Sequence, residues 1–143
     1  MDEDAFWQLI EECRPTGPDP DARRLAVTLI ARLASGPLFR VTGFAEQLSW
    51  ALYRLDRKEF GLGMSGDGFL YARAGVVAAG RTEFDSALAD PALFARYAAG
   101  NDWAEGFLYV PDRAYEHITG EEWDRRTRYC YDSHSNAAGW SGV

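Results

Sequence analysis

The chain has 143 residues, a formal net charge of −7 and a hydrophobic content of 47%. This is the length of one ordinary domain, and it is sufficient to bury a core without a structural metal or disulfide. Acidic residues outnumber basic ones, 22 to 15, so the overall field repels polyanions and argues against nucleic acid as a partner.

Nothing in the sequence indicates a membrane or secreted protein. No apolar run approaches the ~18 residues that a membrane span requires, and the acidic segment Met1–Asp4 is unlike a signal peptide. The two cysteines, Cys13 and Cys130, are far apart and do not form a disulfide framework. We therefore expect a cytoplasmic protein that does not interact with a membrane.

The first half of the chain contains three segments with helical spacing. Residues 2–14 carry Phe6, Ile10 and Cys13 on one face, which predicts a helix with a buried Cys13 thiol. Asp19-Pro20 is typical of the start of a second helix, which extends to residue 34. The third helix, residues 38–55, has the clearest pattern, since its apolar residues are spaced by three and four positions: Leu38, Val41, Ala45, Leu48, Leu52 and Leu55.

Glycines and prolines divide the second half. Four glycines between residues 61 and 68 predict a loop, and Asp67 is a candidate N-cap for the helix that follows. Pro111 is expected to kink the last long helix, and Gly120 to end it. The helices expected here cover residues 67–79, the neighbourhood of 84–88, 91–97 and 102–119.

Residues 123–143 have no apolar periodicity and are rich in aromatic, glycine and serine residues. We predict an all-α fold, a compact antiparallel bundle of about six or seven short helices within residues 1–122. The irregular tail, residues 123–143, either packs on this domain or is loose.

Three stretches resemble a known family. They are Met64–Arg81 with its Gly-Phe turn, aromatic-Arg helix and closing Gly-Arg, then Phe6–Ile10 and Tyr115–Gly120. Together they are similar to the bacterial family of domains of unknown function DUF4240, over residues 1–120 and with the Gly139-Trp140 pair as a further point of similarity. The resemblance implies a helical domain and assigns no activity.

The segment Gly61–Gly66 has the G-x-G-x-x-G spacing of a dinucleotide-binding loop. That loop binds phosphate only between a strand and a helix, whereas residues 56–60 here have the composition of a helix end. We interpret the segment as a turn between helices.

The tail holds two candidate reactive residues, Cys130 and His134. A zinc site needs three or four ligands and a catalytic thiol needs a positioned base, so we expect no metal site, cofactor or catalytic constellation here. The tail also has arginines at 125, 126 and 128 beside two tyrosines, a pattern that suits phosphate contacts. We expect these arginines to pair instead with three acids just upstream, Glu121, Glu122 and Asp124.

Arg73 is the polar residue of greatest interest. Either its stem covers apolar surface while its charge reaches solvent, or it points into a cleft and binds a carboxylate or an anionic ligand. If such a cleft exists, we expect Asp67, Arg73, Trp103 and Tyr109 to border it.

Three functional hypotheses remain open. The first is a non-catalytic binding or protein-interaction domain, suggested by surplus aromatics, negative charge and the lack of catalytic motifs. The second is a small-ligand-binding protein or enzyme with a cleft around Asp67 and Arg73. The third is a folded carrier whose tail is modified at residues such as Cys130 and His134. The sequence favours the first and argues, on balance, against an enzyme.

Overall fold

Ten α-helices and one 3₁₀ turn form the regular structure of the part of the chain that the computed structural model describes, residues 1–17, 22–100 and 104–141. These residues contain no strand, which confirms the predicted all-α class. The expected start of the second helix at Asp19-Pro20 lies outside the described residues. The elements are α1 (Glu3–Cys13), α2 (Arg23–Ala34), α3 (Leu38–Arg54), α4 (Lys58–Gly61), α5 (Gly66–Ala78), α6 (Arg81–Ala89), α7 (Pro91–Phe94), η1 (Ala95–Tyr97), α8 (Glu105–Leu108), α9 (Val110–Thr119) and α10 (Ala137–Trp140).

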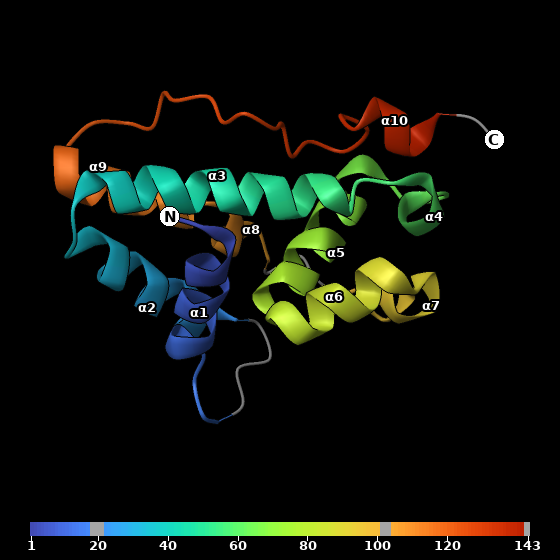
Figure 1. Ribbon diagram of the computed structural model, residues 1–143, viewed down its shortest axis with the longest axis horizontal. Coiled ribbons are helices and arrows are strands. Elements are labelled where there is room, and N and C mark those ends of the chain that lie inside the picture. Colours follow the sequence, from blue (N-terminus) through green and yellow to red (C-terminus); the bar gives the residue numbers. More distant parts are fainter. Residues whose placement is uncertain (18–21, 101–103, 142–143) are drawn as a thin grey trace.

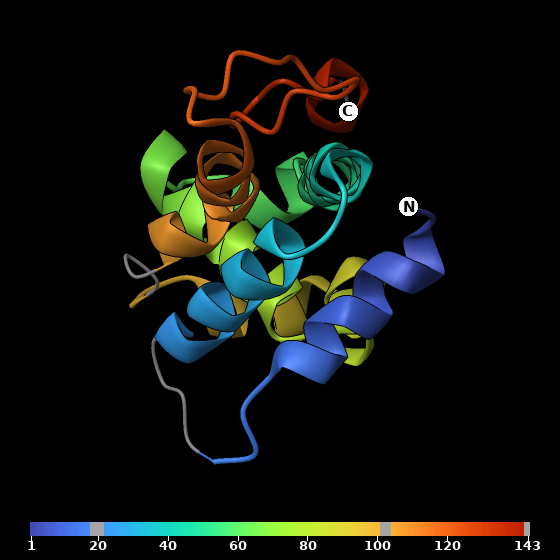
Figure 2. The same ribbon diagram turned by 90° about the vertical axis from the view of Figure 1, so that its left-hand side faces the viewer.

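Helix α3 packs against α1, α2, α5 and α9. Its predicted apolar face is buried, with Val41, Leu48 and Leu52 almost completely excluded from solvent. Helix α9 packs against both α2 and α3, and α1 packs against the same two helices (Figures 1 and 2). None of the described helices is long and apolar enough to cross a membrane.

Aromatic rings hold much of the core together. Phe6 packs against Trp7 and Phe44 at centroid distances of 4.9 and 5.0 Å, and Trp7 continues to Phe84 at 4.9 Å. Cys13 is buried at the edge of this group, as predicted, and burial raises the pKa of its thiol. Seven of the eight phenylalanines are buried, whereas Phe39 is exposed.

The glycine-rich segment is shorter than predicted. Helix α4 ends at Gly61 and α5 begins at Gly66, so the predicted loop over residues 61–68 is wrong at both ends. The segment joins two helices, as expected. A Cβ at Gly61 would lie 2.7 Å from the Phe69 ring, so glycine is required there to let α4 pack against α5.

The predicted capping role of Asp67 is also wrong. Ser65 is the N-cap of α5, and its hydroxyl accepts a hydrogen bond from the Gly68 N–H at 3.0 Å. Asp67 instead lies in the first turn of the helix, exposed to solvent. There its charge interacts favourably with the helix dipole, but the terminal N–H groups are satisfied by serine.

The predicted helix over residues 102–119 is two helices. The chain leaves α8 at Leu108, and α9 begins at Val110 with Pro111 in its first turn. Proline is accommodated there because the first-turn N–H has no helical acceptor. Pro111 therefore sits at the start of a helix and does not kink one. Gly120, with φ +73°, ends α9 as predicted.

Residues 121–136, which we call the strap, run back from the end of α9 along α3 and bring α10 to the far end of α3 (Figures 1 and 2). The strap is held there by the Asp56 carboxylate, which is fully buried. This carboxylate accepts hydrogen bonds from the His134 N–H at 2.9 Å, the Asn136 N–H at 2.9 Å and the Trp140 indole Nε1–H at 2.8 Å. Buried carboxylates require such donors, so the contact ties the tail to the helical domain.

Arg73 makes the second anchor. Its side chain is fully buried. The sequence left two alternatives, a charge that reaches solvent or a side chain that points into a cleft, and the buried position is neither of these. The guanidinium donates to the Leu52 carbonyl at 3.0 Å and to the Ser133 hydroxyl at 2.9 Å, and it lies 4.6 Å from the Phe69 ring centroid. Burial lowers its pKa to about 10, against the attraction of Asp56, so it remains cationic at neutral pH.

The two candidate caps of α5 can be separated by mutation. Ser65→Ala removes the hydrogen bond to the Gly68 N–H and should lower the free energy of unfolding by about 1 kcal/mol. Asp67→Ala leaves that bond in place and should have a smaller effect. Urea unfolding followed by circular dichroism measures both, and a larger loss for Asp67→Ala would contradict the assignment.

Asp56→Asn should release the strap. The amide keeps one acceptor oxygen but turns an NH₂ group towards a backbone donor, and a buried charged hydrogen bond contributes roughly 1.5–3 kcal/mol. We expect faster tryptic cleavage at the strap arginines and loss of amide-exchange protection at residues 134 and 136. Asp124→Asn, in the exposed part of the strap, is the control. Trp140→Phe removes one donor alone and should give a milder form of the same result; unchanged cleavage in both variants would refute the anchor.

Candidate functional site

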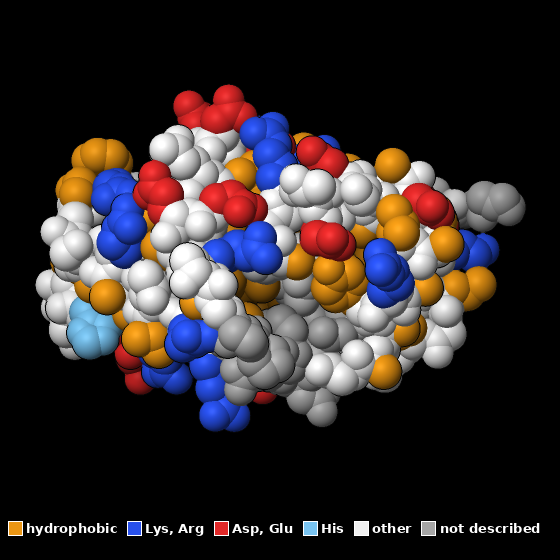
Figure 3. All heavy atoms as spheres, turned by 90° about the horizontal axis from the view of Figure 1, so that it is seen from below, with side chains coloured by type: hydrophobic (Ala, Val, Ile, Leu, Met, Phe, Trp, Pro, Cys, Tyr) orange, Lys and Arg blue, Asp and Glu red, His pale blue; other side chains and the backbone are white. Residues whose placement is uncertain are grey.

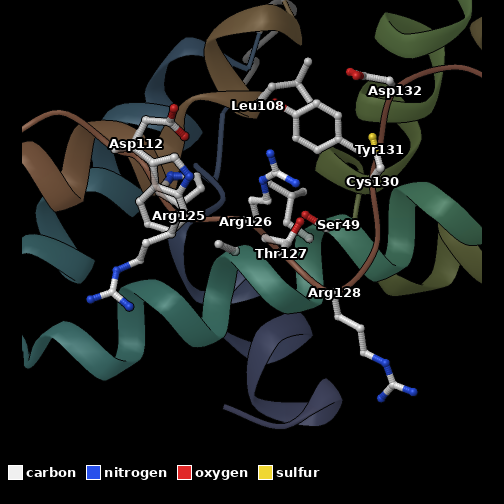
Figure 4. A pocket seen from close by; sticks show the side chains of 14 residues that line it. Ser49, Leu108, Asp112, Arg125, Arg126, Thr127, Arg128, Cys130, Tyr131 and Asp132 are labelled. Atoms are coloured by element: carbon white, nitrogen blue, oxygen red, sulfur yellow. The ribbon is translucent and has the colours of Figure 1, made fainter. Parts of the chain in front are cut away.

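A cavity of about 530 Å³ lies between α3, the α8–α9 junction and the strap (Figure 4). This volume is in the range of small-molecule sites. The helical domain and the tail both contribute to it, so it exists only when the strap is in place. Its lining residues are Ala45, Leu48, Ser49, Leu108, Pro111, Asp112, Trp123, Arg125, Arg126, Thr127, Arg128, Cys130, Tyr131 and Asp132.

The floor is apolar with one hydroxyl group. Ala45, Leu48 and Ser49 lie on one face of α3 because they are three and four positions apart. Leu108 and Pro111 continue the apolar surface onto the α8–α9 junction. Trp123 closes one side and is itself held edge-on against Tyr115, with the ring centroids 5.2 Å apart.

Arg126 is the cation of the cavity. Figure 4 shows its guanidinium directed into the cavity, between the side carrying Asp112 and the side carrying Tyr131. The predicted pairing of the strap arginines with Glu121, Glu122 and Asp124 is wrong: among the described residues, none of those arginines forms an ion pair. The extended strap keeps these sequence neighbours from converging. Arg126 is thus accessible to a ligand and has no carboxylate partner within the described structure.

The neighbouring arginines point elsewhere. In Figure 4 the Arg125 and Arg128 side chains extend away from the cavity centre. Arg125 lies 5.7 Å from the Tyr115 ring centroid, and Arg128 lies 5.3 Å from that of Tyr129. The Arg128 backbone N–H donates to the Glu46 carboxylate at 3.0 Å, which fixes the strap in the register that turns Arg126 inward.

Asp112 and Tyr131 are polar groups whose ionisation the cavity disfavours. Burial raises the pKa of the half-buried Asp112, and Glu116 adds to the shift. Burial also raises the pKa of Tyr131 to about 12, with Asp112 as the largest of the charges that add to it. Tyr131 therefore presents a neutral hydroxyl at neutral pH.

The residues expected to border a cleft do not share one. Asp67 is exposed at the start of α5, and Arg73 is buried beneath the strap. Tyr109 lies between α8 and α9, and its hydroxyl donates to Glu105 at 3.3 Å. Trp103 lies outside the described residues. None of the three described residues lines the cavity.

The two tail candidates have different surroundings. Cys130 has an exposed free thiol that lines the cavity. His134 adopts φ +72°, directs its backbone N–H to Asp56 and packs on Trp140 with the ring centroids 4.2 Å apart. No group of three or more His, Cys, Asp or Glu side chains in the described residues could hold a metal ion. Both residues therefore belong to the strap, one facing the cavity and one in the anchor.

Sequence reasoning missed Asp56, Asp112 and the inward turn of Arg126. Asp56 follows the C-cap of α3, and nothing in the neighbouring sequence indicates that its carboxylate is buried. Asp112 follows a proline in a first helical turn, where acids are favoured by the dipole. The strap arginines were noticed as a cluster, but only the three-dimensional course of the strap separates Arg126 from its neighbours.

The face of the molecule seen from below carries a mixed set of side chains (Figure 3). Its described atoms mix basic, acidic and hydrophobic side chains, with no large area of a single charge.

Asp112→Asn should stabilise the protein at neutral pH. Because the pKa of Asp112 is raised above its ordinary value of 3.8 in the folded state, ionisation costs stability as the pH rises through the folded pKa. Asparagine avoids that cost, so the variant should exceed the parent in urea stability at pH 7, and the difference should shrink towards pH 4. Asp132→Asn, which removes an exposed carboxyl group from the same cavity, should give no such gain; an equal gain there would contradict the prediction.

Comparison with known proteins gives one match. No curated protein and no solved structure is significantly similar to this chain. The model of the family described as "Protein of unknown function (DUF4240)" matches residues 1–117, which include the anchors Asp56 and Arg73, the cavity floor and Asp112. The matched region covers most of the chain and ends just before the strap, and the chain therefore belongs to the DUF4240 family.

Proposed function

We propose that this protein is a non-catalytic binding protein that holds a small organic anion in the cavity beneath the strap. The observation that carries the proposal is the Arg126 guanidinium, which is directed into the cavity without an ion-pair partner among the described residues. A planar guanidinium binds carboxylate, sulfonate or phosphate groups through paired hydrogen bonds.

The rest of the lining supports an organic ligand over an inorganic ion. Leu48, Leu108 and Trp123 offer apolar surface for a hydrocarbon or aromatic body. The neutral hydroxyl of Tyr131 and that of Ser49 offer further hydrogen bonds. A small anion also suits the overall charge, because repulsion by a net charge of −7 grows with the charge of the ligand and is worst for a nucleic acid.

The surroundings of the two histidines support binding over catalysis, and the two cysteines bear on the compartment. Neither His117 nor His134 has a side-chain hydrogen bond to a thiol, hydroxyl or carboxyl group in the described residues, although a nucleophile and its base are expected to be so paired. Both thiols are free, Cys13 buried and Cys130 exposed, which supports a reducing compartment, so we place the protein in the cytoplasm.

The proposal moves the ligand site away from the cleft first expected around Asp67 and Arg73. It also gives the tail a different role from that of a modified carrier segment. Ser133, His134 and Asn136 are engaged with Arg73 and Asp56 and hold the strap in place. Arg126, Cys130 and Tyr131 then form the roof of the cavity.

Arg126→Gln should weaken anion binding at least about tenfold, because a charge-assisted hydrogen bond contributes roughly 1.5–3 kcal/mol. Calorimetric titration with 3-phenylpropionate, 2-phenylethanesulfonate and phenyl phosphate measures the effect. Arg125→Gln is the matched control, since it removes the same charge from the adjacent residue, whose side chain points away, and should change affinity less than about twofold.

Three results would refute the proposed function. The first is that none of the three anions binds the parent protein. The second is that both arginine variants lose affinity equally, which would indicate a general charge effect. The third is hydrolysis of phenyl phosphate by the parent but not by Arg126→Gln, which would show a catalytic site. Recovery of each probe unchanged, with 3-phenylpropanamide binding more weakly than its acid, supports anion binding.

A further inference from the structure

Two carboxylates face the same cavity as Arg126. Asp112 comes from the first turn of α9 and Asp132 from the strap, and Figure 4 shows them on opposite sides of the Arg126 guanidinium. Neither forms an ion pair with another described residue. A site for a simple anion gains nothing from uncompensated negative charge beside its only inward cation, so these carboxylates require an explanation.

The two carboxylates differ in how their charge is compensated. Asp132 is exposed and lies near enough to the buried Arg73 for the two charges to attract each other. Asp112 is half-buried, and the nearest cation on its own helix, Arg113, is 3.6 Å from the carboxylate of Glu116 instead. The charges that act on Asp112 are Glu116, which raises its pKa, and Arg113, which lowers it, both on the same helix; the neutral Tyr131 lies on the strap.

We propose that the ligand is a zwitterion, with its acid group on Arg126 and its ammonium group on Asp112. This inference rests on the proposed anion site and names the class of molecule that the site takes. A ligand cation would supply the ion-pair partner that no described residue gives Asp112. The Trp123 and Tyr131 rings line the same space and add the aromatic faces that attract an ammonium group.

The apolar floor defines the remainder of the ligand. Ala45, Leu48 and Leu108 offer hydrocarbon contacts and no charge, so the body between or beside the two charged groups is aliphatic or aromatic. Aromatic amino acids and short peptides with free termini have this chemistry. They differ in the distance between the ammonium and carboxylate groups. Their relative affinities therefore report how far apart Asp112 and Arg126 hold the two charges of the ligand.

Calorimetric titration at pH 7 tests the proposal with four probes that share a phenyl-substituted body. 3-Phenylpropionate is the anion and 2-phenylethylamine is the cation. L-Phenylalanine and glycyl-L-phenylalanine are zwitterions with a short and a long distance between the ammonium and carboxylate groups. We expect at least one zwitterion to bind at least about fivefold more tightly than 3-phenylpropionate. Asp112→Asn should abolish that preference while strengthening the binding of 3-phenylpropionate, because it removes a repulsive charge. Asp124→Asn, which removes an exposed carboxylate of the strap that does not line the cavity, is the control and should leave the preference unchanged. Asp132→Asn tests the other carboxylate of the cavity.

The outcomes separate this inference from the function on which it rests. If 3-phenylpropionate binds through Arg126 but neither zwitterion is preferred, the zwitterion assignment is overturned and the anion site stands. If Asp132→Asn and not Asp112→Asn abolishes the preference, the assignment to Asp112 is overturned. If 3-phenylpropionate and both zwitterions fail to bind the parent, both proposals fail together. Circular dichroism of each variant confirms that the fold is retained.

Discussion

The Asp56 carboxylate, buried at the end of α3, accepts hydrogen bonds from three N–H groups that lie 78, 80 and 84 residues further along the chain. The strap between α9 and α10 has no helix or strand of its own to hold its course. Its position is therefore set where it ends, at Asp56, and on the way, at Glu46 and Arg73. Because the strap carries Arg126, Cys130 and Tyr131, the cavity has a defined roof only while these contacts persist.

The two buried charges beneath the strap explain why its register is specific. Asp56 and Arg73 do not form an ion pair with each other within the described structure. Asp56 accepts from two backbone N–H groups and the Trp140 indole, whereas Arg73 donates to a backbone carbonyl and a hydroxyl group and its Nε has no hydrogen-bond partner. Removing the strap would leave a carboxylate without its donors and a guanidinium without its Ser133 acceptor, which is costly in a protein interior. A shift of the strap by one residue would misplace the same groups. Gly139 fits this arrangement, since a Cβ there would lie 2.8 Å from the Asp56 carbonyl oxygen.

The sequence predicted the features that depend on residues close together in the chain and missed those that depend on residues far apart in it. The spacing of Val41, Leu48 and Leu52 identified α3 because residues three and four positions apart lie on the same face of a helix. The prediction of Asp67 as the cap was wrong because Ser65, two positions earlier, is also a capping residue type, and only the backbone conformation shows which of them begins the helix. Asp56 and the strap were missed for a different reason: their contacts join residues about 80 apart, and no local pattern records such a pair. The strap arginines were predicted to form ion pairs with acids nearby in the sequence. In an extended segment, however, the side chains of neighbouring residues point in different directions.

Only part of the cavity comes from the region that matches the family model. This limits what membership in the family implies about ligand binding. Residues 1–117 supply the floor, Asp112 and the two anchors, so the family region provides the fold and the place where a tail can lie. The guanidinium that faces the ligand comes from residue 126, beyond that region. Membership in DUF4240 therefore does not by itself imply an anion site, because the decisive cation belongs to a segment that the family model does not cover. In this protein the helical domain offers the carboxylate and the apolar surface, the strap adds the opposite charge, and the ligand preference that we propose arises only from their combination.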